Sequence, residues 1–234
     1  HALRPEEVDS TMGAGGALEA LKIAKDKDMI GHIGLTSHHV GVLIDLMKTG
    51  EFETVMFPFN VIEREPEKEL LSLAKENDIG TVVMKPLAGG AISNIEKAFR
   101  FFNGYDVDLI LNGVSNLREL NENLKCAENQ TPLTPKELSD FENEVAALGK
   151  DFCRRCSYCM PCTNDILIPD MINVFYQTIQ GKRFEDLAIE KQDMGRNLRI
   201  WLEACEECGQ CEEKCPYNIP IIKRKNEMLK IFPE

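Results

Sequence analysis

Eight of the nine cysteines fall in two short runs near the C-terminal end of the chain, and their spacing constrains the fold more than any other feature. The runs are Cys153-x2-Cys156-x2-Cys159-x2-Cys162 and Cys205-x2-Cys208-x2-Cys211-x3-Cys215. Two residues between successive cysteines let a tight loop place three sulfur atoms around one centre. Thiolate sulfur is a soft donor that suits iron–sulfur clusters and zinc. The spacing therefore predicts two loops organised around inorganic centres.

The second run continues into Pro216 and has the Cys-x2-Cys-x2-Cys-x3-Cys-Pro spacing of bacterial ferredoxins. In two-cluster ferredoxins the fourth cysteine of each run ligates the other cluster, so we expect two 4Fe–4S clusters. Their ligands would be Cys153, Cys156, Cys159 and Cys215 for the first, and Cys205, Cys208, Cys211 and Cys162 for the second. The first run departs from this pattern because only two residues precede Cys162, and Thr163 stands in place of proline.

Two other uses of the cysteines stay open. The eight thiols match two structural zinc ions in all-cysteine sites, although zinc sites normally pair one Cys-x2-Cys with a distant second one. Disulfides are disfavoured because such closely spaced thiols would be strained and the sequence has no secretory feature. The ninth cysteine, Cys126, is predicted to be a small buried apolar residue on a helix, without a function.

A short internal sequence repeat follows the fourth cysteine of each run. The pattern Cys-x2-Asp/Asn-Ile-x-Ile reads Asp165, Ile166 and Ile168 after the first run, and Asn218, Ile219 and Ile221 after the second. This repeat predicts a duplicated half-site in which each half supplies apolar isoleucines around a cluster.

The charge distribution divides the chain near residue 150. Residues 1–150 carry 15 basic and 25 acidic side chains, whereas residues 151–234 carry 12 and 14. This asymmetry predicts two domains, 1–150 and 151–234. The net charge of −12 disfavours nucleic acid as a partner, and no apolar run is long enough to predict a membrane span.

Short apolar runs alternate with helical patterns in the first domain. We expect strands at 32–36, 54–59, 81–84 and 107–111, and helices at 17–24, 42–47, 70–74, 117–124 and 134–147. Thr134 and Glu137 form a capping-box pattern at the start of the last helix. Four βα units predict half of a barrel or a small parallel sheet, with an edge strand and an apolar face exposed. The second domain is expected to be mostly helical, with helices at 170–176, 198–203 and 226–230.

Four motifs in the first domain are similar, in their order, to the C-terminal half of an aldo/keto reductase. The motifs are His1-Ala2-Leu3-Arg4-Pro5, Gly31-His32-Ile33-Gly34-Leu35-Thr36-Ser37, Met84-Lys85-Pro86-Leu87-Ala88-Gly89-Gly90 and Gly113-Val114-Ser115-Asn116-Leu117-Arg118-Glu119-Leu120-Asn121-Glu122-Asn123. With the cysteine runs, the chain resembles the subfamily that carries an appended ferredoxin-type domain. The resemblance implies an α/β fold, the second half of a (β/α)8 TIM barrel, followed by a mostly helical ferredoxin-like domain.

The resemblance also implies roles for residues at the ends of the strands, where βα barrels place their active sites. His1 would orient a substrate carbonyl. The positions implied to bind a nicotinamide cofactor, NADP or NAD, are Thr36, Ser37, Lys85, Leu87, Gly113, Ser115, Glu122 and Asn123. Taken alone, Thr36 and Ser37 are more typical of caps of the following helix than of cofactor-binding residues.

Several positions depart from the family pattern. Ser37 stands where an Asn usually binds the nicotinamide amide, Met56 where a Gln does, and Met84 where a Tyr often stacks on the ring. Gly113 and Glu119 stand where many members place a Lys and an Arg on the 2′-phosphate. The choice between NADP and NAD therefore stays open.

The family's catalytic Tyr, Lys and Asp lie on earlier strands that this sequence does not contain. Since the chain begins with His1, we expect a fragment or processed product that does not reduce carbonyls by the family mechanism. The full-length protein is expected to be a cytoplasmic iron–sulfur oxidoreductase that acts on a small carbonyl or alcohol and has a redox partner protein. The alternatives are a ferredoxin-like electron carrier with a non-catalytic barrel scaffold and a zinc-stabilised interaction module.

Overall fold

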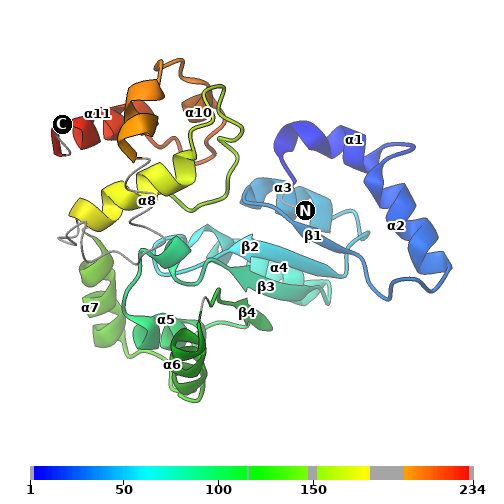
Figure 1. Cartoon of the computed structure of the whole chain (residues 1–234). Coiled ribbons are helices and arrows are strands. Elements are labelled where there is room, and N and C mark those ends of the chain that lie inside the picture. Colours follow the sequence, from blue (N-terminus) through cyan, green and yellow to red (C-terminus); the bar gives the residue numbers. More distant parts are fainter. Residues whose placement is uncertain (1–2, 115, 147–151, 180–197, 232–234) are drawn as a thin grey trace. The chain divides into compact units, whose positions relative to one another are not determined.

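A computed structural model describes residues 3–114, 116–146, 152–179 and 198–231 of the chain (Figure 1). The chain forms two compact units, His1–Ala147 and Leu148–Glu234, and each is described by itself. The predicted domain boundary near residue 150 falls among residues 147–151, which lie outside the described residues.

The first unit is built on a four-stranded parallel sheet, in agreement with the predicted α/β class. Its strands are β1 (Gly34–Thr36), β2 (Thr54–Pro58), β3 (Gly80–Met84) and β4 (Leu109–Leu111), and they lie in the order β1-β2-β3-β4. All four predicted strands are present. Met84 pairs with Pro58 on one side and Leu111 on the other, so the carboxyl ends of the strands meet at one edge.

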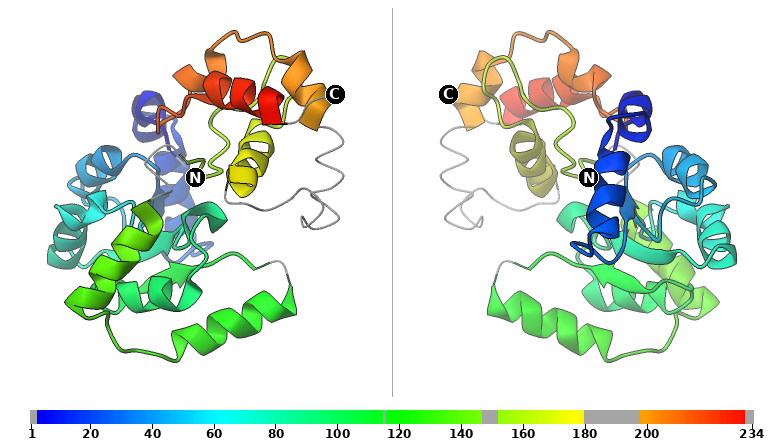
Figure 2. Two further views of the ribbon diagram at one scale, coloured as in Figure 1. Left: turned by 90° about the vertical axis from the view of Figure 1, so that its left-hand side faces the viewer. Right: turned by 90° about the vertical axis from the view of Figure 1, so that its right-hand side faces the viewer.

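Helices alternate with these strands. They are α1 (Val8–Met12), α2 (Ala17–Asp26), α3 (Val40–Met47), α4 (Leu70–Glu76), α5 (Ile95–Phe102), α6 (Leu117–Ala127) and α7 (Pro135–Ala146), with short 3-10 helices η1 (Pro5–Glu7), η2 (Glu65–Glu67) and η3 (Ala88–Gly90). The α3 and α4 helices pack against each other on the same side of the sheet (Figure 2). All five helices predicted for this unit are observed, whereas α1 and α5 were not predicted.

An aromatic cluster forms much of the core of the first unit. The ring of Phe59 follows β2 and lies 5.4 Å from Phe101 and 5.7 Å from Phe102, measured between ring centroids. Both of these partners come from α5, which begins at the cap Asn94, whose side chain accepts a hydrogen bond from Lys97 N at 3.2 Å. The missed helix therefore supplies a large part of this core.

The predicted capping box at the start of α7 is confirmed. Thr134 Oγ1 accepts from the backbone N–H of Glu137 at 3.3 Å, and Glu137 Oε2 accepts from the backbone N–H of Thr134 at 2.8 Å. The same carboxylate accepts two hydrogen bonds from Arg100 on α5, at 2.9 and 3.0 Å. The cap thus also joins α5 to α7.

Apolar side chains are exposed on β4 and α6, as expected for half of a barrel. Leu109 and Leu111 on β4 are 51% and 47% exposed, although leucines on a central barrel strand would be covered. Leu117, Leu120 and Leu124 on α6 are exposed as well.

All regular secondary structure described in the second unit is helical, and the cysteine runs lie mostly in the loops between the helices. Its elements are α8 (Ile168–Ile179), a helical segment at 198–204, α10 (Gln210–Glu213) and α11 (Ile221–Ile231). The α8 and α11 helices pack against each other, as Figure 1 and Figure 2 both show. The three helices predicted for this unit fall within these elements. No helix among the described residues is long and apolar enough to cross a membrane.

Candidate iron–sulfur site

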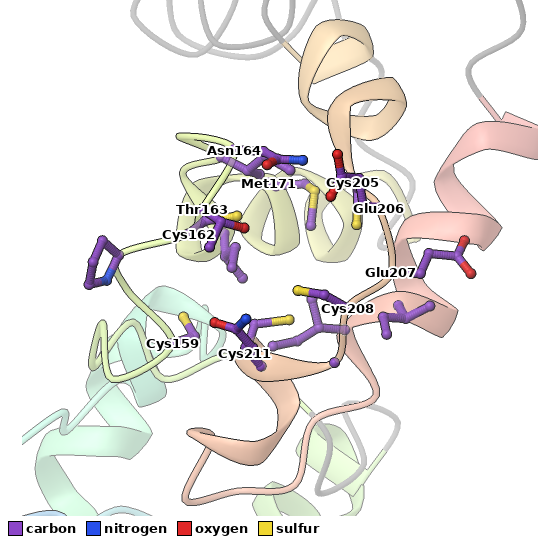
Figure 3. Close-up of a pocket in the computed structure, with 17 residues that line it drawn as sticks. Cys159, Cys162, Thr163, Asn164, Met171, Cys205, Glu206, Glu207, Cys208 and Cys211 are labelled. Atoms are coloured by element: carbon purple, nitrogen blue, oxygen red, sulfur yellow. The ribbon is translucent and has the colours of Figure 1, made fainter.

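The two cysteine runs meet around two cavities in the second unit. Cys153, Cys156, Cys159 and Cys215 line the first cavity. Cys162, Cys205, Cys208 and Cys211 line the second cavity, which Cys159 also reaches. Figure 3 shows Cys205 and Cys208 across the second cavity from Cys162. Each set of four ligands predicted from the spacing is thus gathered at its own cavity, with a thiol from the opposite run in each.

Burial raises the pKa of three of these thiols, Cys153, Cys159 and Cys211. It raises the pKa of the Cys153 thiol to about 11 and that of Cys159 to about 12, and the neighbouring Cys156 and Cys215 add to both shifts. Burial, with Glu212 and Cys205 nearby, raises the pKa of Cys211 to about 11. A cationic iron centre reverses this balance, because coordination deprotonates a thiol outright.

Matching backbone turns shape the two runs. The second residue after each leading cysteine is left-handed, at φ 52° for Arg155 and 55° for Glu207, and so is the fourth, at φ 63° for Ser157 and 80° for Gly209. Non-glycine residues adopt this conformation only where the surroundings hold them there. The same turns at the same steps explain how both loops curl their sulfurs inward.

The sequence repeat after the fourth cysteine of each run also has a repeated backbone structure. Asp165 and Asn218 are left-handed, at φ 53° and 50°, a conformation that Asp and Asn tolerate best among non-glycine residues. Their backbone N–H groups donate to the carbonyls of Cys162 and Cys215 at 3.2 and 3.1 Å. The chain then enters α8 after the first run and α11 after the second.

The repeated isoleucines surround the cavities. Ile166, Ile168, Ile219 and Ile221 are each less than 5% exposed. Ile168 and Ile221 line both cavities, while each of the other two lines one. An apolar shell of this kind limits solvent access to a bound cluster and helps to set its redox potential.

Arg154, which was not among the residues predicted from the sequence, lines the first cavity. It is only 5% exposed, and its guanidinium carbon lies 3.8 Å from the ring centroid of Phe152 and 4.3 Å from that of Tyr217. Its Nη1 donates to the backbone carbonyl of Phe152 at 2.6 Å. The sequence signal for it was an arginine inside a cysteine run, two residues after a phenylalanine.

A buried lysine lies beside the second cavity. Lys225 on α11 is 6% exposed, and its Nζ lies 2.9 Å from Glu207 Oε1. Glu206 and Glu207 both line this cavity. Asn226 Nδ2 also donates to Glu207 at 3.0 Å, and these contacts lower the pKa of the Glu207 carboxyl, Lys225 first.

The donor set fits iron–sulfur clusters in its chemistry, since at least four cysteines line each of two cavities whose remaining walls are largely apolar. Among the described residues, no three His, Cys, Asp or Glu side chains converge tightly enough to hold a single metal ion. A zinc ion needs its sulfurs at ~2.3 Å from one point, whereas a cube of iron and sulfide occupies the space between its ligands.

In the first unit, Thr36 and Ser37 are predicted nicotinamide positions at the end of a strand. Thr36 ends β1, and its buried hydroxyl oxygen has no hydrogen-bond partner within the described structure. Ser37 is fully buried; its hydroxyl donates to the carbonyl of Leu3 at 2.6 Å and accepts from the N–H of His39, the cap of α3, at 3.0 Å. The Ser37 hydroxyl is therefore engaged within the fold.

Lys85 follows β3 in a left-handed conformation, φ 59°. Its carbonyl accepts from Asn60 Nδ2 at 3.0 Å and from the N–H of Ala88 at 2.8 Å. Asn60 is 1% exposed and connects the loops after β2 and β3, a role that the sequence analysis missed. An asparagine directly after a buried strand was its signal. Leu87 is half-buried in the same loop.

The remaining predicted positions are dispersed. Gly113 is exposed after β4, and Asn123 is buried on α6. Glu122 lines a different, polar cavity with Asn94, Cys126 and Glu144, which none of the other predicted positions lines. His1 and Ser115 lie outside the described residues.

Comparisons with known proteins agree with this two-part organisation. Residues 8–107 match the aldo/keto reductase family, and residues 152–220 match the 4Fe-4S dicluster domain. The predicted resemblance is confirmed, and with it the fold class, a partial barrel joined to a ferredoxin-like helical part. No curated protein matches the chain significantly.

Two solved structures of one enzyme, the aldo-keto reductase AKR11C1 from Bacillus halodurans, are similar to part of the chain. The holo form has 21% identity and a TM-score of 0.48, over 55% of this chain and 55% of that one. The apo form has 22% identity and a TM-score of 0.47, over 54% and 55%. The chain thus spans about half the length of these structures.

Proposed function

We propose that the chain, in which an aldo/keto reductase segment precedes a 4Fe-4S dicluster domain, acts in an iron–sulfur oxidoreductase. Its clusters would exchange electrons with a nicotinamide-linked reaction that interconverts a small carbonyl and an alcohol. The observation that carries the proposal is the gathering of four cysteines, three from one run and one from the other, at each of two cavities.

The eight cysteines would hold two 4Fe–4S clusters, which supply one-electron transfer when bound. Reduction of a carbonyl to an alcohol consumes two electrons and two protons. Two one-electron centres match that demand in number, which supports a link between the two units. The isoleucine shell would exclude water from both centres, and Arg154 would bring a fixed positive charge to the first.

The metal content is the first test. The whole chain is reconstituted anaerobically with iron and sulfide, and iron, acid-labile sulfide and zinc are then measured together with the EPR spectrum of the reduced protein. We expect about eight irons and about eight sulfides per chain. Bound zinc without sulfide would overturn the proposal in favour of a zinc-stabilised interaction module.

The nicotinamide link needs a separate test. NADH and NADPH are each added anaerobically to the oxidised cluster protein, while coenzyme binding is followed by calorimetry and cluster reduction by visible absorbance and EPR. Binding of one coenzyme with loss of visible absorbance supports the proposal.

A second candidate is a dedicated electron carrier whose barrel part serves only as a scaffold. The burial of Ser37 favours it, because both hydrogen bonds of its hydroxyl go to the chain itself. Failure of both coenzymes to bind would establish this candidate over the first. In either case the nine free cysteines suit a reducing compartment, so we propose the cytoplasm and a redox partner protein.

A further inference from the structure

An ion pair ties each cysteine run to the helix that follows it, and both pairs start from the same step of the loop. The second residue after the leading cysteine is left-handed in both runs, at φ 52° for Arg155 and 55° for Glu207. Arg155 Nη2 lies 2.8 Å from Asp170 Oδ1 on α8. Glu207 Oε1 lies 2.9 Å from Lys225 Nζ on α11. The two pairs therefore occupy equivalent places, with the charges exchanged between loop and helix.

Resting on the proposed function, we propose that these two ion pairs position the cluster ligands. Lys225 would be the positioning residue of the second cluster, because it holds the left-handed turn at Glu207 that immediately precedes the ligand Cys208. Asp170 would do the same for the first cluster through Arg155.

The left-handed turn has a direct link to a ligand in the first run. The backbone N–H of Arg155 donates a hydrogen bond to Cys153 Sγ at 3.4 Å. Hydrogen bonds to the sulfur atoms orient the ligands of a metal centre and tune its redox potential. Since a non-glycine residue stays left-handed only where its surroundings hold it, the ion pair of the Arg155 side chain helps to keep this backbone N–H on the sulfur.

The equivalent turn in the second run separates a ligand from the residue that is held. Figure 3 shows the Cys208 side chain directed into the second cavity and the Glu207 side chain directed away from it. Neighbouring side chains with opposite directions are coupled through the backbone between them. A displacement of Glu207 would therefore displace Cys208.

Lys225 holds Glu207 as part of a small closed network. Its side chain lies in a residue that is only 6% exposed, and its Nζ donates to Glu207 Oε1 at 2.9 Å and to Asn226 Oδ1 at 3.2 Å. Asn226 Nδ2 donates to the same oxygen of Glu207 at 3.0 Å. A buried ammonium is stable only when it is paired and hydrogen-bonded. Two consecutive residues of α11 thus fix one carboxylate oxygen of the loop.

The second cluster should depend on its ion pair more than the first. Arg155 is exposed and Asp170 is half-buried, and ion pairs at the surface contribute little. Cys208 is exposed as well, whereas the other seven predicted ligands are buried or half-buried. Water and competing chelators can reach an exposed ligand, so its retention depends on how firmly the loop is held.

The test is the release of iron from the reconstituted whole chain to excess EDTA under anaerobic conditions, together with the EPR spectrum of the reduced protein. In K225M, methionine fills the place of the lysine stem, and the Glu207 left behind is exposed, so no charge is stranded in the interior. Half of the iron should leave about tenfold faster than from the wild type, because a hydrogen bond between charged groups contributes more than a neutral one. The EPR spectrum of that cluster should change before any iron is lost.

Variants that hold a single cluster assign the effect. In a C153S background, which keeps the second cluster, K225M should accelerate the release of all the iron. In a C205S background, which keeps the first cluster, K225M should change nothing. D170N should show the opposite pattern in the two backgrounds, with a smaller acceleration.

Matched variants separate positioning from general loss of structure. K223M, at an exposed position of the same helix, should release iron as the wild type does. E207K/K225E restores the pair with its charges exchanged, which is the arrangement of the first run. This double variant should recover slow release and the EPR spectrum of the wild type.

The possible failures are distinguishable. A chain that binds neither iron nor sulfide overturns the proposed function and this inference with it. A K225M variant that behaves as the wild type, or that accelerates the release from both clusters equally, overturns this inference alone. So does an E207K/K225E variant that has the helix content of the wild type but still releases iron as fast as K225M.

Discussion

The side-chain amide of Asn164 donates a hydrogen bond of 2.5 Å to the backbone carbonyl of Ala204. Asn164 lies two residues after Cys162, and Ala204 directly precedes Cys205. The bond therefore joins the end of the first cysteine run to the start of the second, beside the cavity that Cys162 and Cys205 line.

Replacing Asn164 with Ala should make one cluster labile. A buried hydrogen bond contributes about 1 kcal/mol, which corresponds to about a fivefold change in an equilibrium. With an iron chelator under anaerobic conditions, we expect half of the iron to be released about fivefold faster than from the wild type. Asn121→Ala, at an exposed position of α6, is the control. Equal acceleration of all the iron would contradict a local role for Asn164.

Cys162 can be tested by its own removal, because it is the ligand whose spacing departs from the ferredoxin pattern. Cys162→Ser should reduce the iron and sulfide content by about half, since one cluster loses a thiolate while the other keeps all four. Cys126→Ser should leave both contents unchanged, because Cys126 lines a polar cavity of the first unit. Full iron content in Cys162→Ser would remove this residue from the ligand set.

The secondary-structure elements that a short sequence pattern specifies could be predicted from the sequence. The β-branched runs at 54–59 and 81–84 became neighbouring strands, and the capping box at Thr134 and Glu137 formed as expected. The spacing also predicted which cysteines gather at each cavity, with Cys215 beside the first run and Cys162 beside the second. Helix α5 was missed although Ile95, Ala98 and Phe102 have helical spacing and Asn94 precedes them as a helix cap.

Contacts between distant residues could not be predicted in the same way. The position of Arg154 depends on Tyr217, 63 residues later, which only the folded loops bring to 4.3 Å. Ser37 reads as a strand-end hydroxyl in the sequence, yet Leu3 and His39 engage it in the structure. Hydrogen bonds of this kind to buried polar groups depend on tertiary packing, which leaves no periodic pattern in the sequence.

The Arg100–Glu137 pair predicts a pH-dependent stability of the first unit. Hydrogen bonding to Arg100, and then to Thr134, lowers the pKa of the Glu137 carboxyl from 4.5 to about 2. A carboxyl whose pKa is lower in the folded protein than in the unfolded chain stabilises the fold when the pH is above the unfolded-state pKa. This contribution is lost as the pH falls from about 4.5 towards 2. Glu137→Gln should therefore weaken the hydrogen-exchange protection of α7 at pH 7.

The difference between Glu137→Gln and the wild type should shrink steadily as the pH is lowered below 4.5, after correction for intrinsic exchange rates. Exchange resolved by mass spectrometry isolates α7 from acid effects on the second unit. Glu76→Gln, at the exposed end of α4, serves as the control. A difference that stays constant from pH 7 to pH 3 would show that the carboxylate charge contributes nothing.

Removal of the central ring of the aromatic cluster should destabilise the first unit strongly. Phe59 is 0% exposed, and its ring centroid lies 4.9 Å from that of Tyr105 in addition to its contacts with α5. Phe59→Ala leaves a cavity that the surrounding rings cannot fill, so we expect a loss of ~3–5 kcal/mol in the free energy of unfolding. The measurement is urea denaturation followed by circular dichroism. Phe99→Ala, on the half-buried side of α5, should cost clearly less, and equal losses in the two variants would contradict a core centred on Phe59.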